Sequence, residues 1–465
     1  MKLRKNVNSI AFLNISSVFI LQGIAFLSTP IFSRMLGTTQ YGQYSVIHSW
    51  VTIITCFMGL GMNASIGTGM YQFKDEYARF RTSILSFSAL MCMVECIVII
   101  AASWLLRPIL HISVPLVAFI ALLSFAHYVV NFAQNAYIYE KKAFHNFVLS
   151  VATAVITTGL SIYLVWTFPE DQRYMGRVYG MLIPYVAIAI TLLAILLTKQ
   201  EISFEKRFLA FGFQVGFPIV FHLLSQTLLA QSDRVMMEML GISNSEIGIY
   251  SLFYTLCSVL TVVLNALNNT WCPFYYDNLS NDEYDRIRIK TRHYIELFSV
   301  LAFGFLMLSP EVSLLMGDKS YSSGLKVVPI LVSAVFFTFM YQFPVNYEFY
   351  HKKTNIIAMG TIGAAIVNII LNYLLIPSYG MFGAAIATSL SYLALFIVHY
   401  MIVHRLKGVK KYHTSVIAFL PAVAFVSVGV FLFYFLMENY YIRWMIGFAA
   451  GVFELVRVIQ RKSIF

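Results

Sequence analysis

The sequence has few charged side chains for its length. Only 11% of its 465 residues are Asp, Glu, Lys or Arg, while 59% are hydrophobic; a soluble domain has about 25% charged residues. This shortage excludes an ordinary soluble fold. The apolar runs are about 20 residues long, as spanning helices require, and they lack the period-two alternation of membrane barrel strands. We therefore predict an all-α, polytopic membrane protein.

Cysteine pairs and nucleotide-binding loops are also lacking. The five cysteines lie in or beside apolar segments and none forms a C-x-x-C pair, so the sequence offers no metal site or disulfide framework. No G-x-x-x-x-G-K-[ST] loop occurs, which argues against ATP hydrolysis by a P-loop. Residues 59–64 fit G-x-G-x-x-A, but they lie inside a predicted helix and not in a βαβ unit. We predict no bound cofactor.

The apolar runs predict fourteen spanning helices joined by short loops. Met1 to Lys5 is basic and precedes an apolar run too long for a signal peptide core, so the first helix is expected to be uncleaved. The predicted spans are 9–33, 43–67, 82–106, 113–137, 145–168, 176–198, 208–232, 247–272, 293–316, 325–349, 355–376, 380–404, 414–437 and 441–460.

Lys and Arg are distributed unevenly between alternate loops. With the N-terminus in the cytoplasm, 24 of the 32 basic residues fall on the cytoplasmic side. Such an excess sets the orientation of membrane proteins, so we predict both termini in the cytoplasm and an even number of spans. The net charge of +11 comes largely from these loops and indicates contact with anionic lipid rather than nucleic acid.

Two short sequences recur in the second half of the chain. Asn135 to Lys142 returns as Asn346 to Lys353 at an offset of 211 residues, and Met35-Leu36-Gly37 returns as Met239-Leu240-Gly241. Both matches are six predicted helices apart, which indicates a six-helix unit used twice in one orientation. The predicted divisions are a lobe of residues 1–200, a lobe of residues 201–406, and a final helix pair at 407–465.

Polar side chains recur at helical spacing on several predicted spans. Such side chains avoid lipid, so together they indicate a hydrated surface inside the bundle. Hydrogen bonding between helices is the simpler explanation for any single one. The candidate cavity residues are His48, Asn63, Asn131, Gln134, His222, Gln226, Asn265 and Asn269.

Four ionisable residues lie at or near membrane depth. Glu95 is near the centre of its span, where a charge costs about 2.5–3.5 kcal/mol, so it is expected to be neutral or paired, or to couple transport to H+ or Na+. Asp233 is the second candidate for ion coupling. Arg34 and Arg234 end the first and seventh spans, and arginine suits bidentate phosphate contact; a side chain reaching the interface is the alternative for each.

Several motifs occur in a family-like order along nearly the whole chain. They are Ser33 to Gly37 with Tyr41 to Tyr44, Asp233-Arg234, Gly248 to Tyr250, and the run from Leu371 to Thr388. In this order they resemble the polysaccharide-exporter branch of the multidrug/oligosaccharidyl-lipid/polysaccharide (MOP) flippase superfamily. This branch includes the O-antigen and exopolysaccharide repeat-unit flippases.

The resemblance implies two six-helix lobes around a central cavity in the bacterial inner membrane. It implies ion-driven transfer of undecaprenyl-pyrophosphate-linked oligosaccharide, for lipopolysaccharide O-antigen, capsule or exopolysaccharide, from the cytoplasmic to the outer leaflet. A phosphate-contacting role for Arg34, and a polysaccharide polymerase and a chain-length regulator as partners, are also implied. The alternative is a cation-coupled multidrug exporter of the same superfamily. An enzyme is disfavoured because the extracytoplasmic loops are too short for a catalytic cluster.

Overall fold

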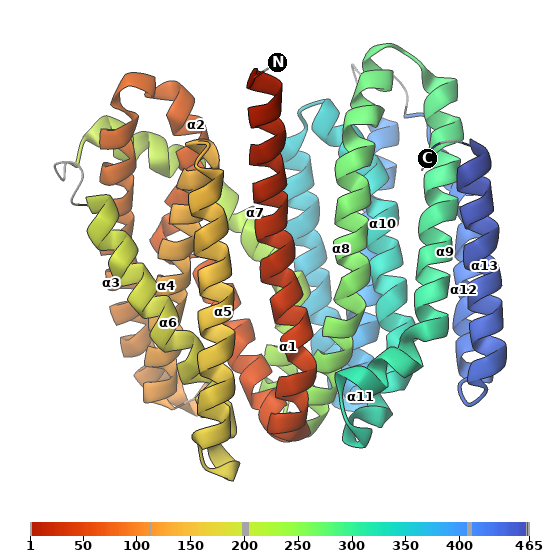
Figure 1. The fold of residues 1–465 in the computed structure, drawn as a ribbon, viewed down its shortest axis with the longest axis horizontal. Helices are drawn as coiled ribbons and strands as arrows, with labels where there is room; N and C mark the ends of the chain where they lie inside the picture. The colour runs from red at the N-terminus through yellow and green to blue at the C-terminus, as the bar shows by residue number, and fades with distance from the viewer. Residues whose placement is uncertain (1, 111–112, 198–203, 407–411, 462, 464–465) are drawn as a thin grey trace. The chain divides into compact units, whose positions relative to one another are not determined.

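The computed structural model describes residues 2–110, 113–197, 204–406, 412–461 and 463, and all regular structure within them is helical (Figure 1). These residues form two compact units, one ending at Gly248 and one beginning at Ile249. Ten described helices are long and apolar enough to cross a membrane, or eleven if one bent pair counts as a span. The predicted all-α, polytopic membrane class is confirmed.

The first unit contains seven α-helices and the start of an eighth. Phe73, Phe80, Phe208 and Phe211 pack ring against ring, which joins the N-terminal ends of the third and seventh helices. The elements are α1 (Lys2–Thr55), η1 (Met58–Ala64), α2 (Ser65–Gln72), η2 (Lys74–Glu76), α3 (Tyr77–Leu110), α4 (Val114–Tyr139), α5 (Ala143–Thr167), η3 (Glu170–Gln172), α6 (Arg173–Leu197), α7 (Lys206–Met239) and α8 (Asn244–Ser280).

The second unit contains most of α8 and five further α-helices. Trp271, Tyr294 and Phe343 form its aromatic centre, with ring centroids 5.1–5.9 Å apart. Its remaining elements are α9 (Tyr284–Met316), η4 (Lys319–Val327), α10 (Val328–Tyr350), α11 (Thr354–Arg405), η5 (Val416–Phe419), α12 (Leu420–Phe435) and α13 (Tyr440–Arg461). The predicted lobes 1–200 and 201–406 and the pair 407–465 stay predictions.

Two helices are far longer than one bilayer span. α1 has 54 residues and α11 has 52, about 80 Å each if straight, against about 30 Å of hydrocarbon. Each is broken by one glycine in the left-handed φ region, Gly37 (φ 64°) in α1 and Gly380 (φ 52°) in α11. Glycine adopts such a φ at little cost because it has no Cβ.

The family-like run from Leu371 to Thr388 lies around the break in α11. Asn372 donates to Asn368 and Asn368 donates to Thr388 across the break, at 3.1 and 3.4 Å, and all three residues are buried. A Cβ on Gly383 would lie 2.4 Å from the Leu375 carbonyl oxygen. The run therefore holds the two halves of α11 together, which gives the motif a structural role.

The span predicted at 43–67 is wrong as a single helix. α1 ends at Thr55, and η1 and α2 follow after a 63° bend. Gly59, Leu60 and Gly61 all have positive φ, between 53° and 67°. The glycines that resembled a dinucleotide motif instead allow the backbone to leave the helix inside the unit.

The two copies of the repeated sequence share one backbone conformation. Lys141 and Lys352, 211 residues apart, both have positive φ (58° and 56°). In each copy the next lysine donates from its backbone N–H to a carbonyl five residues earlier, Lys142 to Tyr137 at 2.8 Å and Lys353 to Glu348 at 2.9 Å. Both helices thus end in the same left-handed turn, which supports the internal repeat at the level of local structure.

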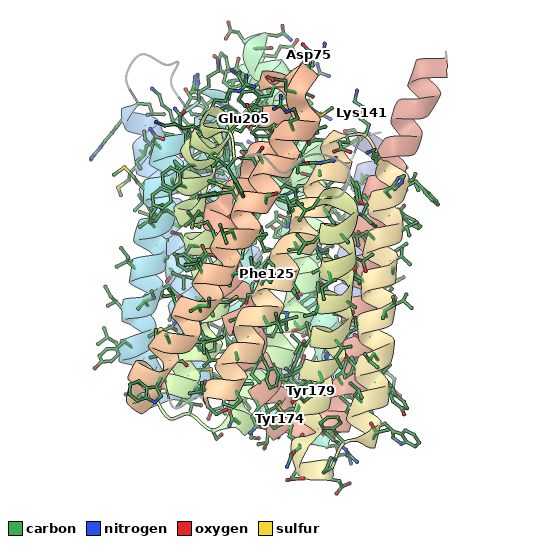
Figure 2. All side chains as sticks on the ribbon, turned by 90° about the vertical axis from the view of Figure 1, so that its left-hand side faces the viewer. Asp75, Phe125, Lys141, Tyr174, Tyr179 and Glu205 are labelled. Carbon is green, nitrogen blue, oxygen red and sulfur yellow. The ribbon has the colours of Figure 1, made fainter. Side chains whose placement is uncertain are left out.

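Charged loops of the first unit gather at one end of its helices. Figure 2 shows Asp75, Lys141 and Glu205 at that end and Tyr174 and Tyr179 at the other. These positions agree with the alternation of charged loops that the basic-residue count predicted. Ion pairs join the loops there, including Arg79 with Glu205 at 2.9 Å and the buried pair Arg81 with Glu140.

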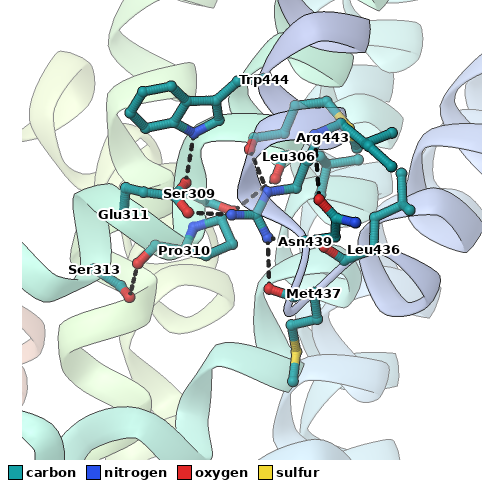
Figure 3. A network of polar contacts seen from close by, with 12 residues as sticks. Leu306, Ser309, Pro310, Glu311, Ser313, Leu436, Met437, Asn439, Arg443 and Trp444 are labelled. Carbon is teal, nitrogen blue, oxygen red and sulfur yellow. Dashed lines mark hydrogen bonds and ion pairs between the residues drawn. The ribbon is translucent and has the colours of Figure 1, made fainter.

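A buried hydrogen bond and an ion pair of a buried arginine tie the second unit together. His399 on α11 lies with its Nδ1 2.7 Å from the Glu348 carboxylate on α10, and neither side chain is exposed. Arg443, at the start of α13, contacts Glu311 and donates to the carbonyl oxygens of Met307 and Met437 at 2.8 Å (Figure 3).

Candidate functional site

An arginine that the sequence analysis did not select as a site candidate lies among aromatic rings in the first unit. The guanidinium of Arg177, on the first turns of α6, is centred 3.6 Å from the Phe32 ring and 5.1 Å from the Tyr44 ring, both on α1. Its Nε and Nη1 atoms are buried without a hydrogen-bond acceptor in the described part of the chain. A buried N–H without an acceptor is costly, so this side chain is suited to receive an anion.

Two of the predicted site residues, His48 and Arg234, interact electrostatically with each other, and His48 also interacts with Arg177. His48, on the second half of α1, is 5.9 Å from Tyr44 between ring centroids, and both Arg177 and Arg234 act electrostatically on its ring. Arg234 on α7 is only 5% exposed and donates to the Ala230 carbonyl oxygen at 2.6 Å. We call His48, Arg177 and Arg234 the cationic cluster.

The other charged candidates have different environments. Asp233, next to Arg234 in the chain, is fully buried. Arg34 is exposed on α1, whereas Arg234 is buried. The predicted equivalence of the two arginines therefore does not extend to their burial.

Three predicted amide side chains lie together at a cavity of about 270 Å³. Asn63 from η1 and Asn131 and Gln134 from α4 line it, and Gln134 donates to the Ser150 hydroxyl on α5 at 3.0 Å. Sequence reasoning missed Asn146 and Ser150 on α5, which line the same cavity. Amide and hydroxyl groups both donate and accept hydrogen bonds, so this lining suits the hydroxyl groups of a sugar.

The polar stripe of α7 divides between two directions. His222 is half-buried, with its Nδ1 lacking a partner in the described residues, and Gln226 is exposed. The contacts with α1 are made instead by Thr227, whose hydroxyl is 3.2 Å from the Cys56 sulfur, and by Gln231, which accepts from Ser49 at 3.0 Å. The helical period of the sequence could not show which of two adjacent polar residues, Gln226 or Thr227, faces α1.

Glu95 on α3 holds the irregular backbone between α1 and α2. Its Oε2 accepts a hydrogen bond from the backbone N–H of Gly59 at 2.9 Å. Gly59 has left the helix, so its N–H needs an acceptor inside the membrane-spanning part. This contact gives Glu95 a structural role, and its predicted part in ion coupling stays a prediction.

We expect Glu95→Leu to destabilise the protein and Glu95→Gln to be nearly neutral. Leucine leaves the Gly59 N–H without an acceptor, at a cost of about 1–3 kcal/mol, whereas the glutamine carbonyl can replace the carboxylate oxygen. Thermal melting of the purified variants in one detergent measures this. Equal melting midpoints for the leucine and glutamine variants would contradict the structural role.

Two candidates belong to the second unit, which is described by itself. Asn265 and Asn269 on α8 are both exposed. Their neighbour Asn268 accepts from Asn346 on α10 at 2.9 Å. In the described residues no group of three His, Cys, Asp or Glu side chains is placed to hold a metal ion.

The model of the family described as "Polysacc_synt: Polysaccharide biosynthesis protein" matches residues 8–277, more than half of the chain. A relative described as an uncharacterized membrane protein of Haemophilus influenzae (strain Rd) is 23% identical over 352 residues, which cover 71% of this chain and 81% of the relative.

Solved structures share the fold at low identity. The structure titled "Lipid II flippase MurJ, inward closed conformation" matches with a TM-score of 0.74 and 14% identity, over 97% of this chain and 99% of its own. An inward-facing multidrug resistance MATE family transporter of the MOP superfamily matches with a TM-score of 0.63 and 12% identity, over 90% of this chain and 99% of its own. At these identities the likeness establishes the fold alone.

Proposed function

Since the chain belongs to the polysaccharide biosynthesis protein family, we propose that it is a flippase for lipid-linked oligosaccharide. The substrate would be an undecaprenyl-pyrophosphate-linked repeat unit of O-antigen, capsule or exopolysaccharide, moved from the cytoplasmic to the outer leaflet of the bacterial inner membrane. The fold shared with a lipid II flippase supports the proposal, because that relative's named substrate is also lipid-linked.

The observation that carries the proposal is the cationic cluster. Arg177 has buried N–H groups without an acceptor among the described residues, and it shares the field around His48 with Arg234. A pyrophosphate supplies the acceptors that these groups lack, through charge-assisted bonds. The amide cavity around Asn63, Asn131 and Gln134 adds partners for sugar hydroxyls.

The transport cycle follows from these surfaces. The head group and sugars occupy polar surfaces while the polyprenyl tail stays in the bilayer. Binding of H+ or Na+, with Glu95 and Asp233 as candidate sites, shifts the populations of inward- and outward-open states. Both termini lie in the cytoplasm, and the partners are the polymerase and chain-length regulator that act on the exported unit.

The proposed cycle includes fourteen spans. The glycine breaks at Gly37 and Gly380 support this number, because α1 and α11 then supply two spans each. The remaining spans are α3 to α10, α12 and α13, while α2 is too short to cross.

A cation-coupled drug exporter is the second candidate, because a multidrug transporter shares the fold. A cationic drug needs a free acid in its cavity, but in the first unit Glu95 already accepts the Gly59 N–H. Dye accumulation in cells separates the two candidates: a flippase for lipid-linked oligosaccharide should not change it.

We expect Arg177→Ala combined with Arg234→Ala to decrease export of surface glycan strongly. Each hydrogen bond to a charged group is worth about 1.5–3 kcal/mol, so loss of one such bond lowers the rate about 10- to 100-fold. Surface glycan is measured in a strain carrying only the variant, with the amount of protein in the membrane determined in parallel.

Arg173→Ala is the matched control for this experiment. Arg173 lies one turn before Arg177 on α6, but its guanidinium has partners. It pairs with Glu170 at 3.2 Å and donates to the Met35 carbonyl oxygen at 3.4 Å, which leaves only its Nε without an acceptor in the described residues. Its loss should leave glycan export within a few-fold of the wild type. Export by the double variant at the level of this control, with equal protein, would refute the phosphate role of the cluster.

A further inference from the structure

A large cavity of the second unit lies apart from the candidate site. It has a volume of about 910 Å³ and is bordered by α9, η5, α12 and α13. These helices pack side by side in Figure 1. Ile295, Ala418, Pro421, Phe425 and Phe453 give it largely apolar walls. We call this cavity the C-terminal groove.

Polar groups without partners gather at the end of the groove nearest the start of α9. Both ring nitrogens of His413 and the hydroxyl of Thr291 are buried there and lack hydrogen-bond partners in the described residues. Thr291 is 3% exposed. Burial and the nearby charge of Arg288 lower the pKa of His413 to about 4, so its ring is neutral at pH 7 and can donate one hydrogen bond. Buried polar groups are normally hydrogen-bonded, and the oxygen atoms of a ligand can supply these bonds.

The charges at this end are positive in sum. Glu296 and Glu454 are satisfied by Arg457 and Arg461, at 2.6–3.4 Å. Two further lining residues remain, Arg288, whose ion pair is with the exposed Asp285, and Arg292, for which the described residues supply no ion pair. Two guanidinium groups beside two partnerless polar groups fit an oxygen-rich anion.

The predicted position of this end in the membrane indicates which kind of anion it binds. The basic residues of 286–292 are among those predicted on the cytoplasmic side, which places them at the level of the lipid phosphates. From there the apolar wall of the groove follows α9 from Ile295 to Val300, toward the membrane interior. Basic pockets between helices on the cytoplasmic side bind anionic head groups. Apolar walls below a cationic end match an acyl chain below a phosphate.

We propose that the C-terminal groove binds an anionic phospholipid of the inner leaflet. One acyl chain lies along Ile295, Ala418 and Phe425, and the phosphate contacts Arg288, Arg292, His413 and Thr291. This site is separate from the proposed transport function, because the phospholipid is a resident ligand and not the transported molecule.

The test measures binding of phosphatidylglycerol to the purified full-length protein by native mass spectrometry. We expect Arg288→Ala/Arg292→Ala to weaken binding tenfold or more relative to Arg286→Ala. Arg286 lies on the same helix end, and its substitution removes one positive charge where the pair variant removes two, but it pairs with Glu283 outside the groove. Equal affinity of the arginine pair variant and this control, after correction for one extra charge, would overturn the proposal.

Two further measurements decide the occupant. Ala418→Trp fills the apolar part and should also weaken binding tenfold, with both arginines in place; if it does not fold, the arginine variants decide alone. Undecaprenyl phosphate that displaces phosphatidylglycerol at equal concentration would assign the groove to the carrier lipid instead and overturn the proposal. Because binding is measured without transport, its outcome is independent of the glycan export experiment.

Discussion

Arg443→Leu is expected to destabilise the packing of α13 on α9 by about 3–5 kcal/mol, the cost of breaking a buried ion pair. The arginine is completely buried, and its guanidinium contacts Glu311 as well as backbone carbonyls from two elements. Leucine fills similar space but leaves the Met307 and Met437 carbonyl oxygens without this donor, and Glu311 with only the Trp444 indole (Figure 3).

Thermal melting and limited proteolysis of the C-terminal helices measure this effect. Trp444→Phe is the control, because it removes only the indole donor that lies 3.0 Å from Glu311, a loss of about 1 kcal/mol. A midpoint for Arg443→Leu as high as that of the control would show that the network does not stabilise the unit.

Glu348→Leu is expected to cost about 1–3 kcal/mol, because it leaves a buried polar group without its partner, and the double variant Glu348→Leu/His399→Leu less than that. The single change leaves a buried imidazole with no acceptor at Nδ1, and its Nε2 already lacks a partner in the described part of the chain. The double change removes the polar groups together, and an apolar pair of similar size can be nearly neutral. The order of stability, not only its size, is therefore predicted.

A double-mutant cycle on melting midpoints, completed with His399→Leu, measures the coupling of the pair. The His399 ring packs closely against Gly360, since a Cβ at that position would lie only 2.2 Å from Nε2. Leucine is shorter than histidine, so it fits into this limited space. Additive losses from the two single variants would mean that the pair does not act as one unit.

Much of the fold follows from composition and pattern. Apolar runs that are long enough to cross a bilayer indicate spanning helices, so the long helices and their approximate positions were predictable. Alternating basic loops were predictable too, and Asp75, Lys141 and Glu205 do lie at one end of their unit. The repeat was visible in the sequence because Lys141 and Lys352 end two helices through the same left-handed turn.

The candidate site was predicted only in part. Asn63, Asn131 and Gln134 line one cavity, although Asn63 lies on η1 and not on the continuous helix from which its position was predicted. Arg177 was missed because its importance depends on N–H groups buried between α1 and α6 without an acceptor in the described residues, which no local sequence pattern reveals. Glu95 was recognised as unusual, but its partner, the Gly59 N–H, depends on a helix break that the apolar pattern conceals.

The sequence by itself determined that this chain is a helical membrane protein, because the lengths of its apolar segments and the charges of its loops are local properties of the chain. Tertiary structure alone decided which polar groups are left without partners, as at Arg177 and His413, since that depends on contacts between residues far apart in sequence. The family-like run around Gly380 shows the same division: its residues were recognisable, but its role in closing a helix hairpin was evident only from the hydrogen bonds.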